Sequence, residues 1–232
     1  LDISLPLSKS FLVSFFEGSH QDNQRFLNSL GGSKGVFFEF KDRNKSSMLS
    51  YQMGVMKDST SLLGISSEGG FGSPNNSSTS FLGFESLNTF RTVSLRSSIH
   101  LGKNSSSFNE LGFINEMDDS IFSAFNFSLF KNSIFVQNDS LSLEIYQPLR
   151  SEISSMNLNL PVGRTKDRKI LFNDYKIDLT PSGRQINSQL VYSSSSKYIT
   201  FFGKIGLVSN EFHNQANHTK PYFLLDIEFN LK

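Results

Sequence analysis

The chain has 232 residues, a net charge of +1 and no cysteine. The near-neutral charge argues against a nucleic-acid partner, which usually requires a basic patch. The absence of cysteine excludes disulfides, thiolate metal sites and a cysteine nucleophile. No run approaches the roughly 18 consecutive apolar residues of a membrane-spanning helix.

Segments of alternating apolar and polar residues recur along the chain, and a period of two is typical of strands with one apolar and one polar face. The pattern predicts strands within residues 1–18, 35–41, 47–57, 79–88, 90–101, 120–130, 141–150, 156–162, 174–179, 185–192, 198–209 and 222–232. Long polar connections are expected at 20–34, 58–78, 102–119 and 210–220. A loop as long as 58–78 needs a function or a covering role.

The clearest pattern lies between Asp139 and Tyr192. Four alternating runs follow one another there, each separated from the next by a turn or break. The first run sets Leu143 and Ile145 against Ser142 and Glu144. We expect all four runs to be strands of one sheet with an apolar and a polar face.

The whole chain therefore predicts an all-β domain over residues 1–232. Its expected form is a transmembrane antiparallel up-and-down β-barrel of about 12 strands. Many of the expected strands approach the roughly ten residues that a tilted membrane-crossing strand needs. A soluble β-sandwich that buries the apolar face and serves as a binding or adhesin domain is the alternative, because its strands also alternate.

In the barrel interpretation the polar face lines the lumen and the apolar face contacts lipid. The candidate lumen-lining residues are Arg96, His100, Asn126, Glu144, Arg150, Asn157, Asn159, Lys176, Asp178, Asn187, Gln189, Lys204, Asp226 and Glu228. The candidate lipid-facing residues are Leu141, Leu143, Ile145, Leu158, Leu160, Ile177, Leu190, Phe223, Leu225, Ile227 and Phe229.

Three turn motifs stand in order between these strands, at 147–150 (QPLR), 160–164 (LPVGR) and 179–184 (LTPSGR). In these three motifs and their order, the chain resembles the C-terminal translocator barrel of bacterial autotransporters, particularly those that follow a subtilisin-like serine protease passenger. Residues 61–64 (SLLG) and 69–72 (GGFG) are similar to that family's segment between early strands.

The resemblance implies a twelve-stranded barrel in the bacterial outer membrane that helps its own N-terminal passenger reach the cell surface. The implied partners are outer-membrane lipid, the barrel assembly machinery and the passenger in cis. A small porin-like channel without a passenger is the alternative within the same fold.

Catalytic motifs are absent from the sequence. The four histidines are scattered, and neither a G-x-S-x-G nor an H-E-x-x-H motif occurs. His213 and His218 share one expected loop, and we expect them to be solvated rather than to hold a metal. Pro181, Ser182 and Gly183 predict an ordinary hairpin turn. We expect no enzymatic activity and no cofactor.

Overall fold

The computed structural model describes residues 2–6, 10–21, 30–44, 46–58, 74–108 and 112–229, and the segments 59–73 and 22–29 of two expected loops lie outside that part. Side-chain positions are described for 5–6, 10–15, 34–44, 46–58, 76–108 and 112–229. The described chain is almost entirely strand, with one short 3₁₀ helix, η2 (Glu211–His213).

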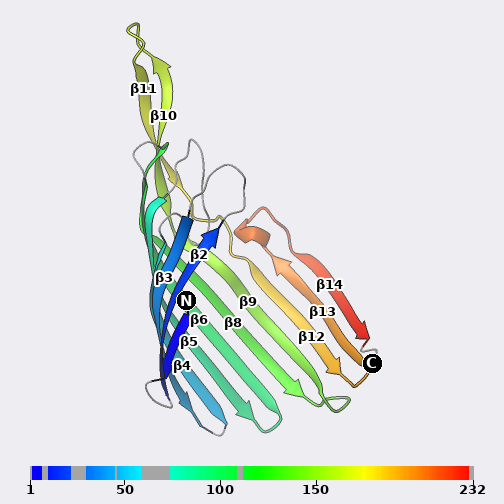
Figure 1. Cartoon of the computed structure of the whole chain (residues 1–232). Coiled ribbons are helices and arrows are strands. Elements are labelled where there is room, and N and C mark those ends of the chain that lie inside the picture. The colour runs from blue at the N-terminus through cyan, green and yellow to red at the C-terminus, as the bar shows by residue number, and fades with distance from the viewer. Residues whose placement is uncertain are drawn as a thin grey trace.

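Most strands belong to one antiparallel sheet of 11 strands, in the order β1-β2-β3-β4-β5-β6-β8-β9-β12-β13-β14 (Figure 1). Its members are β1 (Asp2–Pro6), β2 (Phe11–Gln21), β3 (Leu30–Arg43), β4 (Ser47–Asp58), β5 (Pro74–Phe90), β6 (Val93–Phe108), β8 (Ser120–Asn132), β9 (Asp139–Ile153), β12 (Ile186–Ser195), β13 (Ile199–Ser209) and β14 (Lys220–Phe229). Because nearly every strand pairs with the next along the chain, the topology is up-and-down, as predicted.

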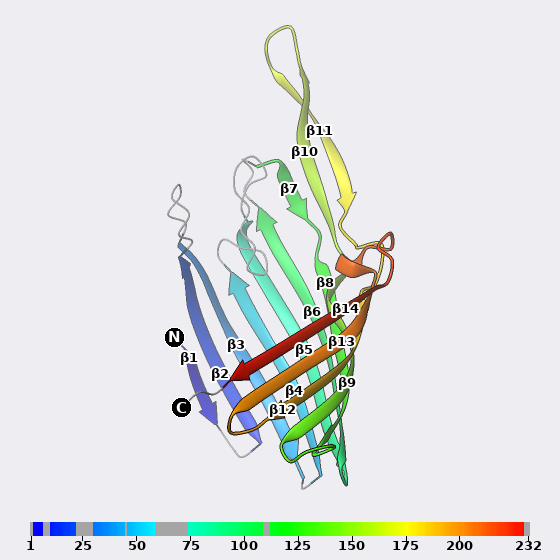
Figure 2. The ribbon, with the colours of Figure 1, turned by 90° about the vertical axis from the view of Figure 1, so that its right-hand side faces the viewer.

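A second, three-stranded sheet has the order β11-β10-β7. It consists of β7 (Ile114–Met117), β10 (Ser155–Arg164) and β11 (Ile170–Asp178). Figures 1 and 2 show the β10–β11 hairpin extending well beyond one end of the large sheet. The prediction that all four runs between Asp139 and Tyr192 belong to one sheet is therefore wrong, because β9 pairs directly with β12 and the hairpin lies outside.

Connections between successive strands of the large sheet alternate between its two ends. The strand ends that are joined by short connections (residues 7–10, 44–46, 91–92, 133–138 and 196–198) lie at one end of the sheet. The strand ends that are joined by longer connections (22–29, 59–73, 109–119, 154–185 and 210–219) lie at the other. We call these ends the short-turn rim and the long-connection rim. The hairpin belongs to the long-connection rim.

The large sheet curls but is not closed into a barrel. Strands β1 and β14 are its two edges and are not paired with each other over the described residues. In Figure 1, β14 lies apart from β2 and β3. The expected closed barrel of about 12 strands is therefore not observed. All neighbouring pairs are antiparallel, so the first and the eleventh strand run in the same direction.

Several strands reach further than the sequence pattern predicts. Strand β6 continues to Phe108 and β3 begins at Leu30, so parts of the expected loops 102–119 and 20–34 are strand. The serine-rich end of β6 is held in the sheet by its ladder with β5, where Asn104 pairs with Thr79. A strand with polar residues on both faces gives no period-two signal, which explains the difference.

Candidate functional site: the two faces of the large sheet

Many large apolar side chains on one face of the large sheet are exposed. On β4, Tyr51, Met53 and Val55 are between 46% and 53% exposed, and Leu143 on β9 is 48% exposed. Cross-strand pairing brings such residues into continuous rows. One row runs through Leu95, Leu129, Leu143, Leu190, Ile205 and Phe223. Among the described side chains, the buried apolar residues are Val13, Ile114 and Leu158.

The opposite face is polar, and many of its side chains are buried. Glu39 accepts hydrogen bonds from Ser50 Oγ (2.9 Å) and Gln52 Nε2 (3.2 Å) and pairs with Lys41 Nζ (2.7 Å). Its own exposure is 6%. Figure 2 shows the curl of the large sheet. We assign the polar face to its concave side, because many polar side chains are buried there whereas many apolar side chains of the other face are exposed.

A second network on the polar face joins β9, β12 and β14. Glu144 accepts hydrogen bonds from Gln189 Nε2 (2.6 Å) and Ser142 Oγ (3.0 Å). Tyr222 Oη in turn donates to Gln189 Oε1 at 2.5 Å. Its ring lies beneath Lys204, whose Nζ is 5.3 Å from the ring centroid. Because buried polar groups need partners, these networks stabilise a polar interior.

Strand register shows where the candidate residues lie. On the polar face are Arg96, His100, Asn126, Glu144, Asn187, Gln189, Lys204, Asp226 and Glu228. On the apolar face are Leu141, Leu143, Ile145, Leu190, Phe223, Leu225, Ile227 and Phe229. That these faces line a lumen and contact lipid stays a prediction.

The remaining candidates lie elsewhere. Asn157, Asn159, Lys176, Asp178, Leu158, Leu160 and Ile177 belong to the β10–β11 hairpin rather than to the large sheet. Leu158 is buried there at 6% exposure. Arg150 belongs to a cluster at the long-connection rim. The hairpin residues alternate as regularly as those of the large sheet, and a period of two does not say which sheet a strand joins.

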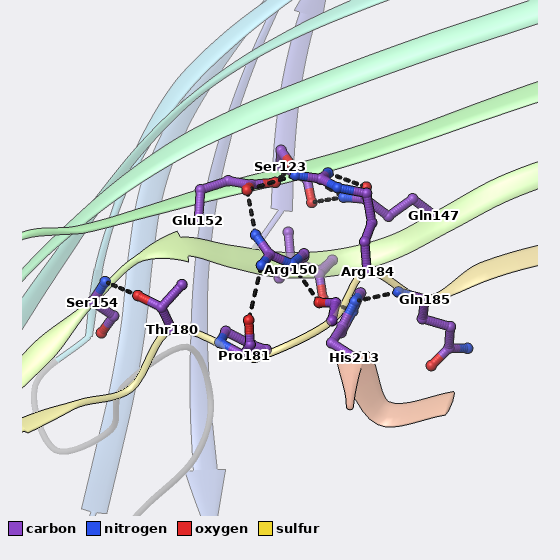
Figure 3. Close-up of polar contacts among 12 residues, drawn as sticks. Ser123, Gln147, Arg150, Glu152, Ser154, Thr180, Pro181, Arg184, Gln185 and His213 are labelled. Carbon is purple, nitrogen blue, oxygen red and sulfur yellow. Dashed lines mark hydrogen bonds and ion pairs between the residues drawn. The ribbon is translucent and has the colours of Figure 1, made fainter. Parts of the chain in front are cut away.

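The rim cluster brings together two of the three motifs (Figure 3). Residues 147–150 (QPLR) lie within strand β9 and do not form the expected turn. The Arg150 guanidinium donates to the backbone oxygens of Pro181 and Gly183, each at 2.9 Å, and contacts the Glu152 carboxylate. Arg184 pairs with Glu152 at 2.8 Å and also bonds Gln147 Oε1. The QPLR and LTPSGR segments are thus locked together, while LPVGR lies towards the hairpin tip.

His213 fastens the connection between β13 and β14 to this cluster. Its Nδ1 accepts the Gln185 backbone N–H (3.0 Å), and its Nε2 is 3.1 Å from the Leu149 backbone oxygen. This arrangement fits the neutral ring. Burial lowers the pKa of His213, and Arg150 and Arg184 lower that pKa further. With both ring nitrogens occupied, His213 is not a free metal ligand.

The expected hairpin turn at Pro181–Gly183 is instead part of a crossing segment, because β11 and β12 are not paired with each other. Gly183 N–H donates to the His213 backbone oxygen at 2.7 Å. A Cβ added at Gly183 would lie 2.7 Å from the Gln215 backbone nitrogen. Close approach of two backbones therefore explains this glycine. Sequence reasoning missed the cluster because its contacts depend on the register shift near Gln147.

Among the described residues, no group of three or more His, Asp or Glu side chains is arranged to hold a metal ion. Within the same part of the chain, no helix is long and apolar enough to span a membrane. Comparisons with family models, with curated proteins and with solved structures found no significant match.

Proposed function

We propose that the large sheet is the wall of an outer-membrane β-barrel whose apolar face contacts lipid. The observation that carries this proposal is the inversion of the two faces: many polar side chains of one face are buried, and many large apolar side chains of the other are exposed. In water, a sheet with such a large exposed apolar surface would be an aggregation or interaction site. In a bilayer, the same surface is satisfied by hydrocarbon.

Strand length and the two rims support the same proposal. Strands β2 to β14 of the large sheet range from 10 residues in β12 to 17 residues in β5, whereas globular strands commonly have about five or six. A membrane-crossing strand needs about nine to eleven. Outer-membrane barrels also have short turns at one rim and longer loops at the other, which is the arrangement of the described strands.

Closing the sheet sets a requirement on its edges. Because β1 and β14 run in the same direction, pairing them directly would create a parallel contact in an antiparallel wall. Bacterial barrels of a single chain have even strand numbers. We propose that one more strand, antiparallel to both edges, completes the barrel in the membrane. This agrees with the twelve strands that the resemblance implies.

The role we propose for this barrel is to export or anchor a passenger at the bacterial cell surface, with no enzymatic activity of its own. The support is the resemblance of the turn motifs, together with the contacts that lock QPLR and LTPSGR at one rim. The proposed partners are lipid, the barrel assembly machinery and the passenger.

Surface display in a Gram-negative host tests this role. A signal peptide and an epitope-tagged reporter are fused ahead of Leu1, and intact cells are treated with protease. We expect the reporter to be cleaved at the surface while the barrel stays in the outer-membrane fraction. A barrel that inserts but leaves its reporter in the periplasm would contradict the export role. Ion conductance from that same barrel would favour the porin alternative.

A further inference from the structure

The tip of the β10–β11 hairpin, residues 164–169 (RTKDRK), carries a dense group of positive charges. It contains one carboxylate, Asp167, and four cations, namely Arg164, Lys166, Arg168 and Lys169. All four cations are exposed, and none of them forms an ion pair with another described residue. The tip therefore has a net charge of +3, although the net charge of the whole chain is +1.

Hydrogen bonds fix the backbone of the turn that holds these cations. The Thr165 N–H donates to the Lys169 backbone oxygen at 2.8 Å, and the Arg168 N–H donates to the Thr165 backbone oxygen at 3.0 Å. The Lys169 N–H also donates to Thr165 Oγ1 at 3.1 Å. The cations are thus held together at the end of a hairpin that extends well beyond the long-connection rim (Figures 1 and 2).

Apolar side chains lie next to this turn on both strands of the hairpin. Val162 on β10 and Ile170, Leu171 and Phe172 on β11 are between 49% and 50% exposed. Successive residues of a strand point to opposite faces, so Leu171 and Phe172 give apolar surface to both faces of the tip.

The base of the same hairpin differs from the tip, because its apolar and charged side chains have partners. Strand β7 pairs with β10 at residues 156–158, and Leu158 and Ile114 are buried there. Lys176, near the base, pairs with Asp118 at 2.7 Å. Towards the tip, β10 pairs with β11 alone among the described strands. A two-stranded hairpin has little stability of its own in water, and here its end combines unpaired positive charge with uncovered apolar surface.

We propose that the hairpin tip binds the surface of an anionic membrane that faces the long-connection rim. Negatively charged phosphate headgroups complement the four cations, and each lysine or arginine near such a surface strengthens binding roughly fivefold. The apolar side chains beside the turn enter the interfacial region, as the apolar face of an amphipathic membrane-binding segment does. A nucleic acid would neutralise the charges but leave these apolar side chains in water, so the combination favours a membrane.

This inference goes beyond the proposed function, because it gives the hairpin a membrane other than the one in which we place the large sheet. The test uses the whole chain folded into nanodiscs of phosphatidylcholine, and it measures co-flotation with separate vesicles. One set of vesicles is pure phosphatidylcholine, and the other also contains anionic phosphatidylglycerol. The readout is the ratio of the two affinities, because binding through the apolar face of the large sheet is common to both sets.

We expect the wild type to prefer the anionic vesicles, and we expect added salt to weaken this preference. A chain that does not enter nanodiscs would count against the proposed barrel and not against the tip. The same ratio of affinities is then measured on the chain without nanodiscs, with the same variants.

The main variant is Lys166→Gln combined with Lys169→Gln, which should lower the preference for anionic vesicles about 25-fold, at roughly fivefold for each charge. Phe172→Ser should lower the affinity for anionic vesicles severalfold by removing apolar surface from the tip. The matched control is Lys131→Gln combined with Lys197→Gln, which removes two exposed lysines at the short-turn rim and should leave the ratio unchanged. These substitutions are at exposed positions and should change stability little, which the heat-dependent gel mobility of each variant checks.

Three results would overturn the binding of a membrane by the tip. The first is equal affinity of the wild type for the two sets of vesicles. The second is a preference for anionic vesicles that Lys166→Gln with Lys169→Gln leaves unchanged. The third is binding of heparin, a soluble polyanion, as tight as that of anionic vesicles together with no effect of Phe172→Ser on either, which would show a general polyanion site.

Discussion

Leu143 lies in the middle of the apolar face and makes the sharpest test of what that face contacts. Its cross-strand partners are Leu129 on β8 and Leu190 on β12, and its side chain is 48% exposed. If the face is in water, an arginine at this position can extend into solvent. Surface substitutions of that kind usually change stability by no more than about 0.5 kcal/mol.

If the face is in lipid, Leu143→Arg should cost about 2–4 kcal/mol near the bilayer midplane. Ser142→Arg is the matched control, since Ser142 is the next residue along β9 and faces the polar side. The control loses the hydrogen bond from Ser142 Oγ to Glu144 Oε1 (3.0 Å), worth about 1 kcal/mol, and gains a carboxylate neighbour.

The assay is the free energy of unfolding in urea for the protein folded into lipid vesicles, followed by circular dichroism. We expect Leu143→Arg to lower that free energy well beyond Ser142→Arg. Equal losses for the two variants, or a loss below about 0.5 kcal/mol for Leu143→Arg, would refute the assignment of the apolar face to lipid.

Three further predictions follow from the rim, the hairpin and one close packing contact. Replacing residues 156–177 with a short turn should leave the heat-dependent gel mobility of the folded protein unchanged, because the sheet of the hairpin contains no strand of the large sheet. Loss of the folded band on the gel would show instead that the hairpin is needed for folding. Burial lowers the pKa of His213 from 6.5, so the contribution of its neutral ring to stability is complete above pH 6.5 and is lost as the pH falls through the lowered pKa. His213→Gln should therefore flatten the dependence of the unfolding free energy on pH in that range. An unchanged slope would contradict the role of the neutral ring. Gly206→Ala should lower the free energy of unfolding by about 1–3 kcal/mol, because a Cβ there would lie 2.6 Å from the Ser188 backbone oxygen and 2.7 Å from the Tyr222 hydroxyl. Gly163→Ala is the control, because a Cβ at that position has nothing within 4 Å. It should leave the free energy of unfolding in urea unchanged.

The sequence predicts the large sheet well where one face is apolar and the other polar. Strands β8, β9, β12 and β13 follow the expected ranges closely because each has this alternation. The alternation does not predict a strand where both faces of the strand are polar. Residues 104–107 are polar on both faces and still form strand, since their ladder with β5 continues there.

The alternation of apolar and polar residues along a strand also does not indicate which sheet that strand joins. Leu158 and Leu160 alternate with Asn157 and Asn159 as regularly as β9 does, yet they form a separate hairpin. The rim cluster depends on contacts between β9, residues 179–185 and η2, which are far apart in the chain. The motif residues of the cluster are recognisable in the sequence, but the partners of Arg150 and Arg184 are not, because they depend on a register shift near Gln147.

The environment of a spin label at position 143 decides whether the apolar face of the large sheet lies in lipid. The sequence contains no cysteine, so a single cysteine at position 143 can be labelled cleanly, with position 142 as its neighbour on the other face. In lipid vesicles we expect the label at 143 to collide with oxygen and to be shielded from a water-soluble nickel chelate, and the label at 142 to show less oxygen collision. A label at 143 that the nickel chelate reaches freely would show that the exposed apolar face is not in lipid.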